Sequence, residues 1–368
     1  MNKHARNYEA KVTVEDKLTP LTLHELASMK DVPATEPVPA FDQAVEYVFE
    51  IEGDAAPAVI AVAAQNRRPA RTKLVVRAKG TIAESGPLAV GESVSSEELS
   101  QSVVGKPAPH AYRPKWLDLV HLPRLVTIPA CDDFGVPNAL SPRVAEQTAR
   151  DWPWNCVGKV EIRRPNQPNS VDVGSGVMVG PNLMLTASHG MPWGASDSTV
   201  KFTPAFRNGS DPRFGHAFVE RWRGIRTGPN DPNGLDYVIC KLNWRIGDRT
   251  GWMGSFHSTD DDFYEDRRWI SVGYPRAFAE GKVPAVEVNV RVADVDNEGS
   301  DGREIETNRF LSGGWSGGPL WGFLNAGDPR VVAIASGAEK DGQDPRRDVH
   351  AGGKHLVDLI KYGFANWA

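Results

Sequence analysis

The sequence predicts a mostly β protein, either a barrel or a sandwich, over the part of the chain that follows residue 150. The chain of 368 residues contains 35 Gly and 28 Pro, which favours a turn-rich β protein over a helix bundle. Short apolar segments also alternate with turns at a regular spacing. These segments are CVGKVEIRR, GSGVMVG, NLMLTAS, STVKFTP, DYVICKL, WISVGYP, AVEVNVRVADV and VVAIASG.

The segment KHLVDLIKYGFANWA follows the last predicted strand and has a different period. Its apolar residues Leu356, Leu359, Ile360 and Phe364 recur with the spacing of one helix face. We therefore expect a closing helix that packs on the β domain.

Residues 1–150 lack the regular strand rhythm, so we divide the chain into an N-terminal accessory or pro-region, 1–150, and a main domain, 151–368. The capping box TLHE predicts one short helix, and EYVFEIE and TKLVVRAKG alternate as strands do. The polar segment 91–101 predicts a loop or a short helix. The apolar spacing from Lys115 onward predicts a helix that Pro123 ends.

Composition and charge exclude several classes of partner. The net charge is −5 with acids and bases mixed along the chain, so we expect neither nucleic acid nor a membrane as a partner. The apolar run 55–64 is too short to span a bilayer. Three cysteines form no disulfide framework and no zinc-binding pair. The charged N-terminal stretch has no apolar core of a secretory signal, which favours an intracellular protein.

The stretch GGWSGGPLW, 313–321, places Ser316 between glycines, either as a nucleophile or as part of an ordinary turn. A serine hydroxyl is a poor nucleophile at neutral pH. It needs a base, usually a histidine oriented by a carboxylate, and donors for the developing oxyanion. Gly314 would let the backbone turn so that its N–H and that of Ser316 point at one spot.

His189 and Asp236 are the candidate partners of this serine. His189 directly follows the second of two apolar strands that are joined by the tight turn Gly180-Pro181-Asn182. Asp236 opens a strongly apolar strand, whereas its competitor Asp231 lies in a turn without apolar neighbours. Each residue taken alone also has an ordinary explanation, because a histidine can bond a local carbonyl and an aspartate often starts a turn.

The motifs TASHG, LDYVICKL and GGWSGGPL stand in this order, and together they resemble the chymotrypsin/trypsin superfamily of serine proteases. The segments WPWNCVGKVEI and VGYP and the closing helix resemble its V8-like glutamyl endopeptidase branch. The resemblance covers about residues 150–368. It implies a double six-stranded antiparallel β-barrel, an exported enzyme, a protein or peptide substrate, and no metal or organic cofactor.

The resemblance also implies a role for each matching residue. Ser316 would attack the scissile carbonyl, His189 would take and return the proton, and Asp236 would orient the imidazole. The N–H groups of Gly314 and Ser316 would form the oxyanion hole. The residues that would bind the substrate are Phe310 and Leu311 in the pocket wall, and Ala335, Ser336 and Gly337 in a strand that pairs with substrate backbone.

Trp315 departs from the family pattern, because digestive relatives have Asp at this place and V8-like relatives usually have Asn. Tryptophan cannot form the ion pair with a freed N-terminus that activates trypsin-type enzymes. A bulky Trp315 would also disturb the oxyanion turn, so a protease-fold binding or scaffold protein without activity stays a second hypothesis. A serine esterase of another fold fits less well, because Gly318-Pro319 would break the helix that follows its nucleophile.

The sequence gives only partial information on substrate specificity and on the role of residues 1–150. Phe310 and Ala335 stand where charged specificities would need an acid or a histidine, so we expect an apolar residue before the scissile bond. Residues 1–150 would either inhibit the cleft or assist folding as a pro-segment, with cleavage near Arg143 or Arg150, or bind a partner as a separate domain.

The acidic segment 293–304 begins like a calcium-binding loop. Ile305 stands at the twelfth position, where that loop needs a bidentate Glu. We therefore expect a polar hairpin at this place.

Overall fold

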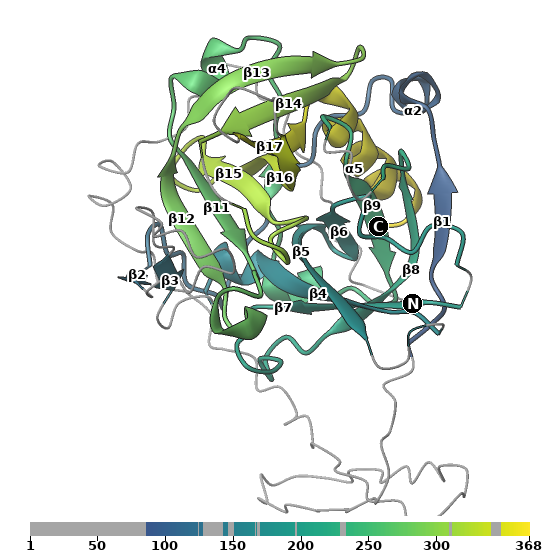
Figure 1. The fold of residues 1–368 in the computed structure, drawn as a ribbon, viewed down its shortest axis with the longest axis vertical. Coiled ribbons are helices and arrows are strands. Elements are labelled where there is room, and N and C mark those ends of the chain that lie inside the picture. Colours follow the sequence, from purple (N-terminus) through teal and green to yellow (C-terminus); the bar gives the residue numbers. More distant parts are fainter. Residues whose placement is uncertain are drawn as a thin grey trace, which may run out of the picture. The chain divides into compact units, whose positions relative to one another are not determined.

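A computed structural model describes residues 86–123, 125–127, 143–145, 151–165, 167, 170–195, 197–228, 233–308, 311–339 and 347–368 (Figure 1). All of these residues belong to one compact unit. The helix and the two strands predicted before residue 80 lie outside the described residues. Among the described residues, no helix is long and apolar enough to cross a bilayer.

The first sheet closes into a six-stranded antiparallel barrel. Its path runs β7-β4-β5-β6-β9, and β8 pairs with both β7 and β9, which joins the two ends. Gly180 pairs with Leu183, so Pro181 and Asn182 form the tight turn that the sequence predicts. The strands are β4 (Val157–Arg163), β5 (Val171–Gly180), β6 (Leu183–Thr186), β7 (Thr199–Pro204), β8 (Ala217–Gly224) and β9 (Val238–Leu242).

The second sheet has the order β13-β14-β17-β16-β15-β11-β12, and all of these pairs are antiparallel. β12 leads into β13 through Arg291 alone, so one stretch of chain forms both ends of this path. Segment 293–304 lies in the β13–β14 hairpin, as predicted. The strands are β11 (Trp269–Gly273), β12 (Ala285–Val290), β13 (Val292–Glu298), β14 (Gly302–Thr307), β15 (Pro319–Phe323), β16 (Pro329–Glu339) and β17 (Arg347–Gly352).

Smaller elements complete the two sheets and the loops. β3 (Arg143–Ala145) pairs with β12, and β2 (Leu125–Thr127) pairs with β3. β10 (Gly254–Ser255) runs parallel to β16. The short helices are η2 (Trp154–Cys156), α3 (Gly247–Thr250), α4 (Asp262–Glu265) and η3 (Ala279–Gly281).

The predicted closing helix is α5 (Lys354–Asn366), and it buries Leu356, Leu359 and Ile360. A second helix, α2 (Ser96–Ser102), forms within the polar segment for which the sequence left a loop or a short helix open. The Ser95 hydroxyl accepts a hydrogen bond from the Glu98 N–H and caps α2. α2 packs against α5 although the two helices lie near opposite ends of the described chain (Figure 1).

The helix predicted from Lys115 to Pro123 is wrong. This segment forms turns and an isolated bridge between Leu119 and Trp152. Its apolar side chains are nearly all buried, whereas a helix with one apolar face would leave its other face in water. The buried residues include Trp116, Leu117, Leu119, Val120 and His121.

Residues before 150 share sheets with the residues after it. β1 (Val90–Ser93) runs parallel to β8 at the edge of the first barrel (Figure 1). Tyr112 bridges to Trp252, and the Trp154 indole donates to the Val120 carbonyl at 2.8 Å. The division predicted at residue 150 therefore does not coincide with a break in the hydrogen-bonded sheets.

The burial of α2 generates a test with two leucines. Leu99→Ala should lower the free energy of unfolding by about 2–5 kcal/mol, because Leu99 is fully buried where α2 meets the rest of the unit. Leu88 is 55% exposed, and Leu88→Ala should change stability by about 0.5 kcal/mol or less. Urea denaturation of both variants measures the difference, and equal effects would contradict the packing of α2.

His355 at the start of α5 generates a pH prediction. Burial lowers the pKa of His355 to about 4, against the opposing charges of Asp301 and Asp358. A histidine in an unfolded chain titrates near 6.5, so the unfolded state binds more protons between these values. The contribution of His355 to the free energy of unfolding is therefore fully present above about pH 6.5, and it is lost as the pH falls toward 4.

Urea denaturation should show a free energy of unfolding that is lower at about pH 4.5 than at about pH 7.5 by on the order of 2 kcal/mol. In His355→Gln this difference between the two pH values should disappear. An identical pH dependence in wild type and variant would show that His355 does not contribute.

Candidate active site

Asp236 is a buried carboxylate that accepts four hydrogen bonds. Oδ1 accepts from the His189 backbone N–H at 2.8 Å and from the Thr227 hydroxyl at 2.7 Å. Oδ2 accepts from His189 Nδ1 at 2.6 Å and from the Ser336 hydroxyl at 2.5 Å. A carboxylate with no exposed surface needs such donors, because nothing else replaces the water that it loses. Asp236 therefore fixes the positions of three other segments of the chain.

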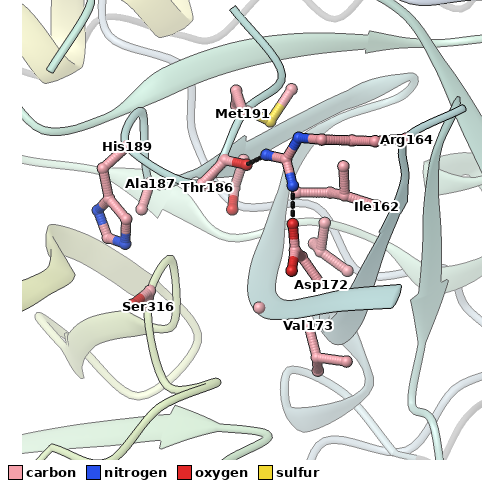
Figure 2. A pocket seen from close by; sticks show the side chains of 12 residues that line it. Ile162, Arg164, Asp172, Val173, Thr186, Ala187, His189, Met191 and Ser316 are labelled. Atoms are coloured by element: carbon pink, nitrogen blue, oxygen red, sulfur yellow. Dashed lines mark hydrogen bonds and ion pairs between the residues drawn. The ribbon is translucent and has the colours of Figure 1, made fainter. Parts of the chain in front are cut away.

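His189 follows β6 in a turn that leaves 17% of its side chain exposed. Nδ1 donates its proton to Asp236, because an ionised carboxylate only accepts hydrogen bonds. The tautomer is thereby set, and Nε2 is left as the basic nitrogen. Figure 2 shows the imidazole and Ser316 at the same end of one pocket.

Ser316 lies in a tight turn that requires two glycines. Gly314 has φ +100° and Gly317 has φ +84°, a region that side chains rarely adopt. A Cβ at Gly314 would meet the Tyr274 carbonyl at 2.6 Å, and one at Gly317 would overlap the Ser175 carbonyl. The Ser316 hydroxyl donates to the Ser336 carbonyl at 3.5 Å, and among the described residues it makes no hydrogen bond with His189. Such bonds are often long before a substrate arrives.

Ser175 on β5 holds the turn from the first barrel. Its N–H donates to the Ser316 carbonyl and its hydroxyl donates to the Gly314 carbonyl, both at 2.8 Å. The same hydroxyl accepts from the Tyr274 N–H at 2.8 Å. Within the described chain, the N–H groups of Gly314 and Ser316 have no hydrogen-bond acceptor. In this turn the carbonyls of Gly314 and Ser316 are therefore hydrogen-bonded to Ser175, whereas the N–H groups of the same two residues have no acceptor among the described residues.

Trp315 points away from the turn and into the second sheet. Its indole N–H donates to the Ser271 hydroxyl at 3.0 Å, and only 1% of the residue is exposed. It packs in a cluster with Phe278, Ala285, Leu311 and Ala335. The bulk of Trp315 is therefore accommodated below the turn.

The residues expected to bind substrate have different surroundings. Phe310 lies outside the described residues, and Leu311 is buried with its N–H donating to the Asp348 carboxylate. The N–H and carbonyl of Ala335 bond to Gly318 and Gly317, so neither group is available for the predicted pairing with substrate. Ser336 and Gly337 follow on β16, and the Ser336 hydroxyl is committed to Asp236.

Sequence reasoning missed three contributors to this site, which are Thr227, Ser175 and the hydroxyl of Ser336. Each acts through a side-chain hydroxyl whose partner lies on another element, and no local sequence pattern marks such a contact. Burial raises the pKa of the adjacent Tyr237 phenol well above its usual range, so that group stays neutral. Within the described ranges, no group of three or more His, Cys, Asp or Glu could hold a metal ion.

The contacts of Ser175 generate a stability prediction. Ser175→Ala leaves the buried Tyr274 N–H and Gly314 carbonyl without their partner and should lower the free energy of unfolding by about 2–4 kcal/mol. Ser198 is a matched control, because its hydroxyl is buried but has no hydrogen-bond partner among the described residues. Ser198→Ala should cost less than about 1 kcal/mol in the same denaturation experiment. Equal losses would contradict a special role for Ser175.

Solved structures that resemble this chain include several proteases and a human heparin-binding protein. A Glu endopeptidase has 18% identity and a TM-score of 0.47, covering 65% of this chain and 100% of its own. The thermostable serine protease AL20 from an extremophilic microorganism has 17% identity and a TM-score of 0.45, covering 58% and 98%. The protease Anisep from Arthrobacter nicotinovorans has 18% identity and a TM-score of 0.44, covering 58% and 96%.

No family model and no curated protein matches the chain. At these identities and TM-scores, the structural likeness does not define an activity for this chain.

Proposed function

We propose that this protein is a serine endopeptidase in which Ser316, His189 and Asp236 act together. One observation carries the proposal: the His189 imidazole donates Nδ1–H to a fully buried carboxylate at 2.6 Å, and it shares a pocket with Ser316. A histidine held in this tautomer can accept a proton at Nε2 and return it later. A buried carboxylate beside it favours the imidazolium that forms in between.

The reaction has two halves. Ser316 Oγ attacks the carbonyl carbon of the peptide bond while its proton passes to His189 Nε2. The proton then moves to the nitrogen of the leaving amine as the C–N bond breaks, and an ester remains on Ser316. In the second half, water attacks the carbon of this ester and loses its proton to Nε2. The bond from that carbon to Ser316 Oγ then breaks, Oγ takes the proton back, and the acid is released.

The N–H groups of Gly314 and Ser316 stabilise the oxyanion in this scheme. Each N–H shares a planar peptide group with the carbonyl of the residue before it. The Gly313 carbonyl accepts from the Arg276 N–H at 2.9 Å and the Trp315 carbonyl accepts from the Gly318 N–H at 2.8 Å, so both peptide groups are held before a substrate binds. Donors that need no reorganisation are worth about 3–4 kcal/mol to the transition state. Trp315 is compatible with this role because its side chain is buried away from the turn.

The chain should react with a fluorophosphonate probe, which requires an activated serine and oxyanion donors. Ser316→Ala should abolish labelling, and Asp236→Asn should slow it by about 10⁴-fold because the imidazole would lose its tautomer. Ser198→Ala is the matched serine control and should label at the wild-type rate.

Intact-mass spectrometry locates the label, and a thermal melt checks that each variant is folded. No labelling of folded wild-type protein would overturn the proposal in favour of a binding or scaffold protein.

A further inference from the structure

We propose that the pocket beside His189 receives the residue that follows the scissile bond, and that the Arg164–Asp172 ion pair makes it selective for an uncharged apolar side chain. This inference rests on the proposed protease function and adds a substrate preference to it. The pocket has a volume of about 390 Å³, enough for one large side chain, and His189 and Ser316 lie together at one end of it (Figure 2).

The position of the pocket identifies which half of the substrate it takes. Apart from Ser316, all of its described lining residues come from the first barrel and the 186–191 segment. The leaving amine receives its proton from His189, so this half of the substrate must lie on the His189 side of Ser316. The acyl half must place its oxygen near the free N–H groups of Gly314 and Ser316, which lie in the turn after the second sheet's strand β14.

The inner wall of the pocket is apolar. Val160 and Ile162 on β4 and Met191 in the loop after His189 are all buried and face this space. Gly174 packs closely on the Ser316 backbone, because a Cβ there would approach the Ser316 carbonyl at 3.2 Å. An apolar side chain that enters is therefore removed from water against apolar atoms.

The charges in the pocket cancel. Among its described lining residues, only Arg164 and Asp172 carry formal charges at neutral pH, and they form an ion pair (Figure 2). Arg164 also donates to the Gly190 carbonyl at 3.2 Å, which anchors it beside the His189 loop. A charged side chain would lose water here without finding a free opposite charge. The pair therefore excludes charged residues of both signs.

This explanation predicts opposite outcomes for the two halves of the pair. Asp172→Asn leaves an unpaired arginine, which should favour an acidic residue. Arg164→Gln leaves an unpaired aspartate, which should favour a basic residue. The double variant carries neither charge and should return to the apolar preference.

The test is acyl transfer, which separates the leaving-group site from the acyl site. The full chain is mixed with a p-nitrophenyl ester, and the burst of nitrophenol measures acylation of Ser316. Added amino-acid amides then compete with water for the acyl group. The α-amine nitrogen attacks the ester carbon, the bond from that carbon to Ser316 Oγ breaks as the amine proton passes through His189 to Oγ, and the amino-acid amide leaves acylated on its α-nitrogen. Leucinamide, glutamic acid α-amide and lysinamide share a similar α-amine, so differences in their partition report the side chain.

Wild-type protein should transfer to leucinamide at least about 10-fold better than to either charged amide, about 1.4 kcal/mol of discrimination. Asp172→Asn should raise the glutamic acid α-amide about 10-fold relative to leucinamide, and Arg164→Gln should do the same for lysinamide. Arg163→Gln is the matched control, because this neighbouring arginine is exposed and does not line the pocket. It should leave all three ratios unchanged.

The outcomes separate this inference from the function on which it rests. A normal burst with unchanged ratios in both single variants, or with both ratios moving in one direction, overturns the pocket assignment alone. A folded wild type without a burst overturns the protease proposal and this inference together. If Arg164→Gln does not fold, Asp172→Asn decides the question by itself, since the Asp172 side chain is 45% exposed and tolerates change.

Discussion

The burial of the Asp236 carboxylate is the constraint on which the site depends. A fully buried charge is stable only when it is surrounded by donors, and here the donors come from three separate segments. His189 follows a strand of the first barrel, Thr227 follows β8, and Ser336 lies on a strand of the second sheet. One carboxylate thus ties both sheets to the imidazole, and loss of any donor would leave part of its charge unpaired.

The turn that carries Ser316 depends on contacts with both sheets. Ser175 reaches across from the first barrel to hold two carbonyls of the turn, while Trp315 anchors the turn in the core of the second sheet. Digestive members of the chymotrypsin/trypsin superfamily have an Asp at the position of Trp315. In this chain the turn is held instead by the Trp315 indole and the Ser175 hydroxyl. Both anchors are residues within the compact unit.

Much of this was predictable from the sequence, and the rest was not for physical reasons. The strand rhythm, the turn at Pro181-Asn182 and the closing helix follow from local periodicity, and the pairing of His189 with Asp236 follows from ordered motifs. The helix predicted after Lys115 was wrong because tertiary burial on all sides overrides one-face spacing. The contributions of Thr227 and Ser175 depend on how the loops and strands that carry them are placed in space, and no sequence pattern around a hydroxyl predicts its hydrogen-bond partner.

The packing of α2 on α5 also has a consequence for how the protein is made. Leu99 is synthesised before the barrels, but the helix beside it begins only at Lys354, after the strands of both sheets. At a synthesis rate of about 5–20 residues per second, the α2 segment waits roughly tens of seconds for its partner. The compact unit therefore cannot be completed until the α5 segment has been synthesised, and before that the apolar face of α2 lacks the partner on which it packs.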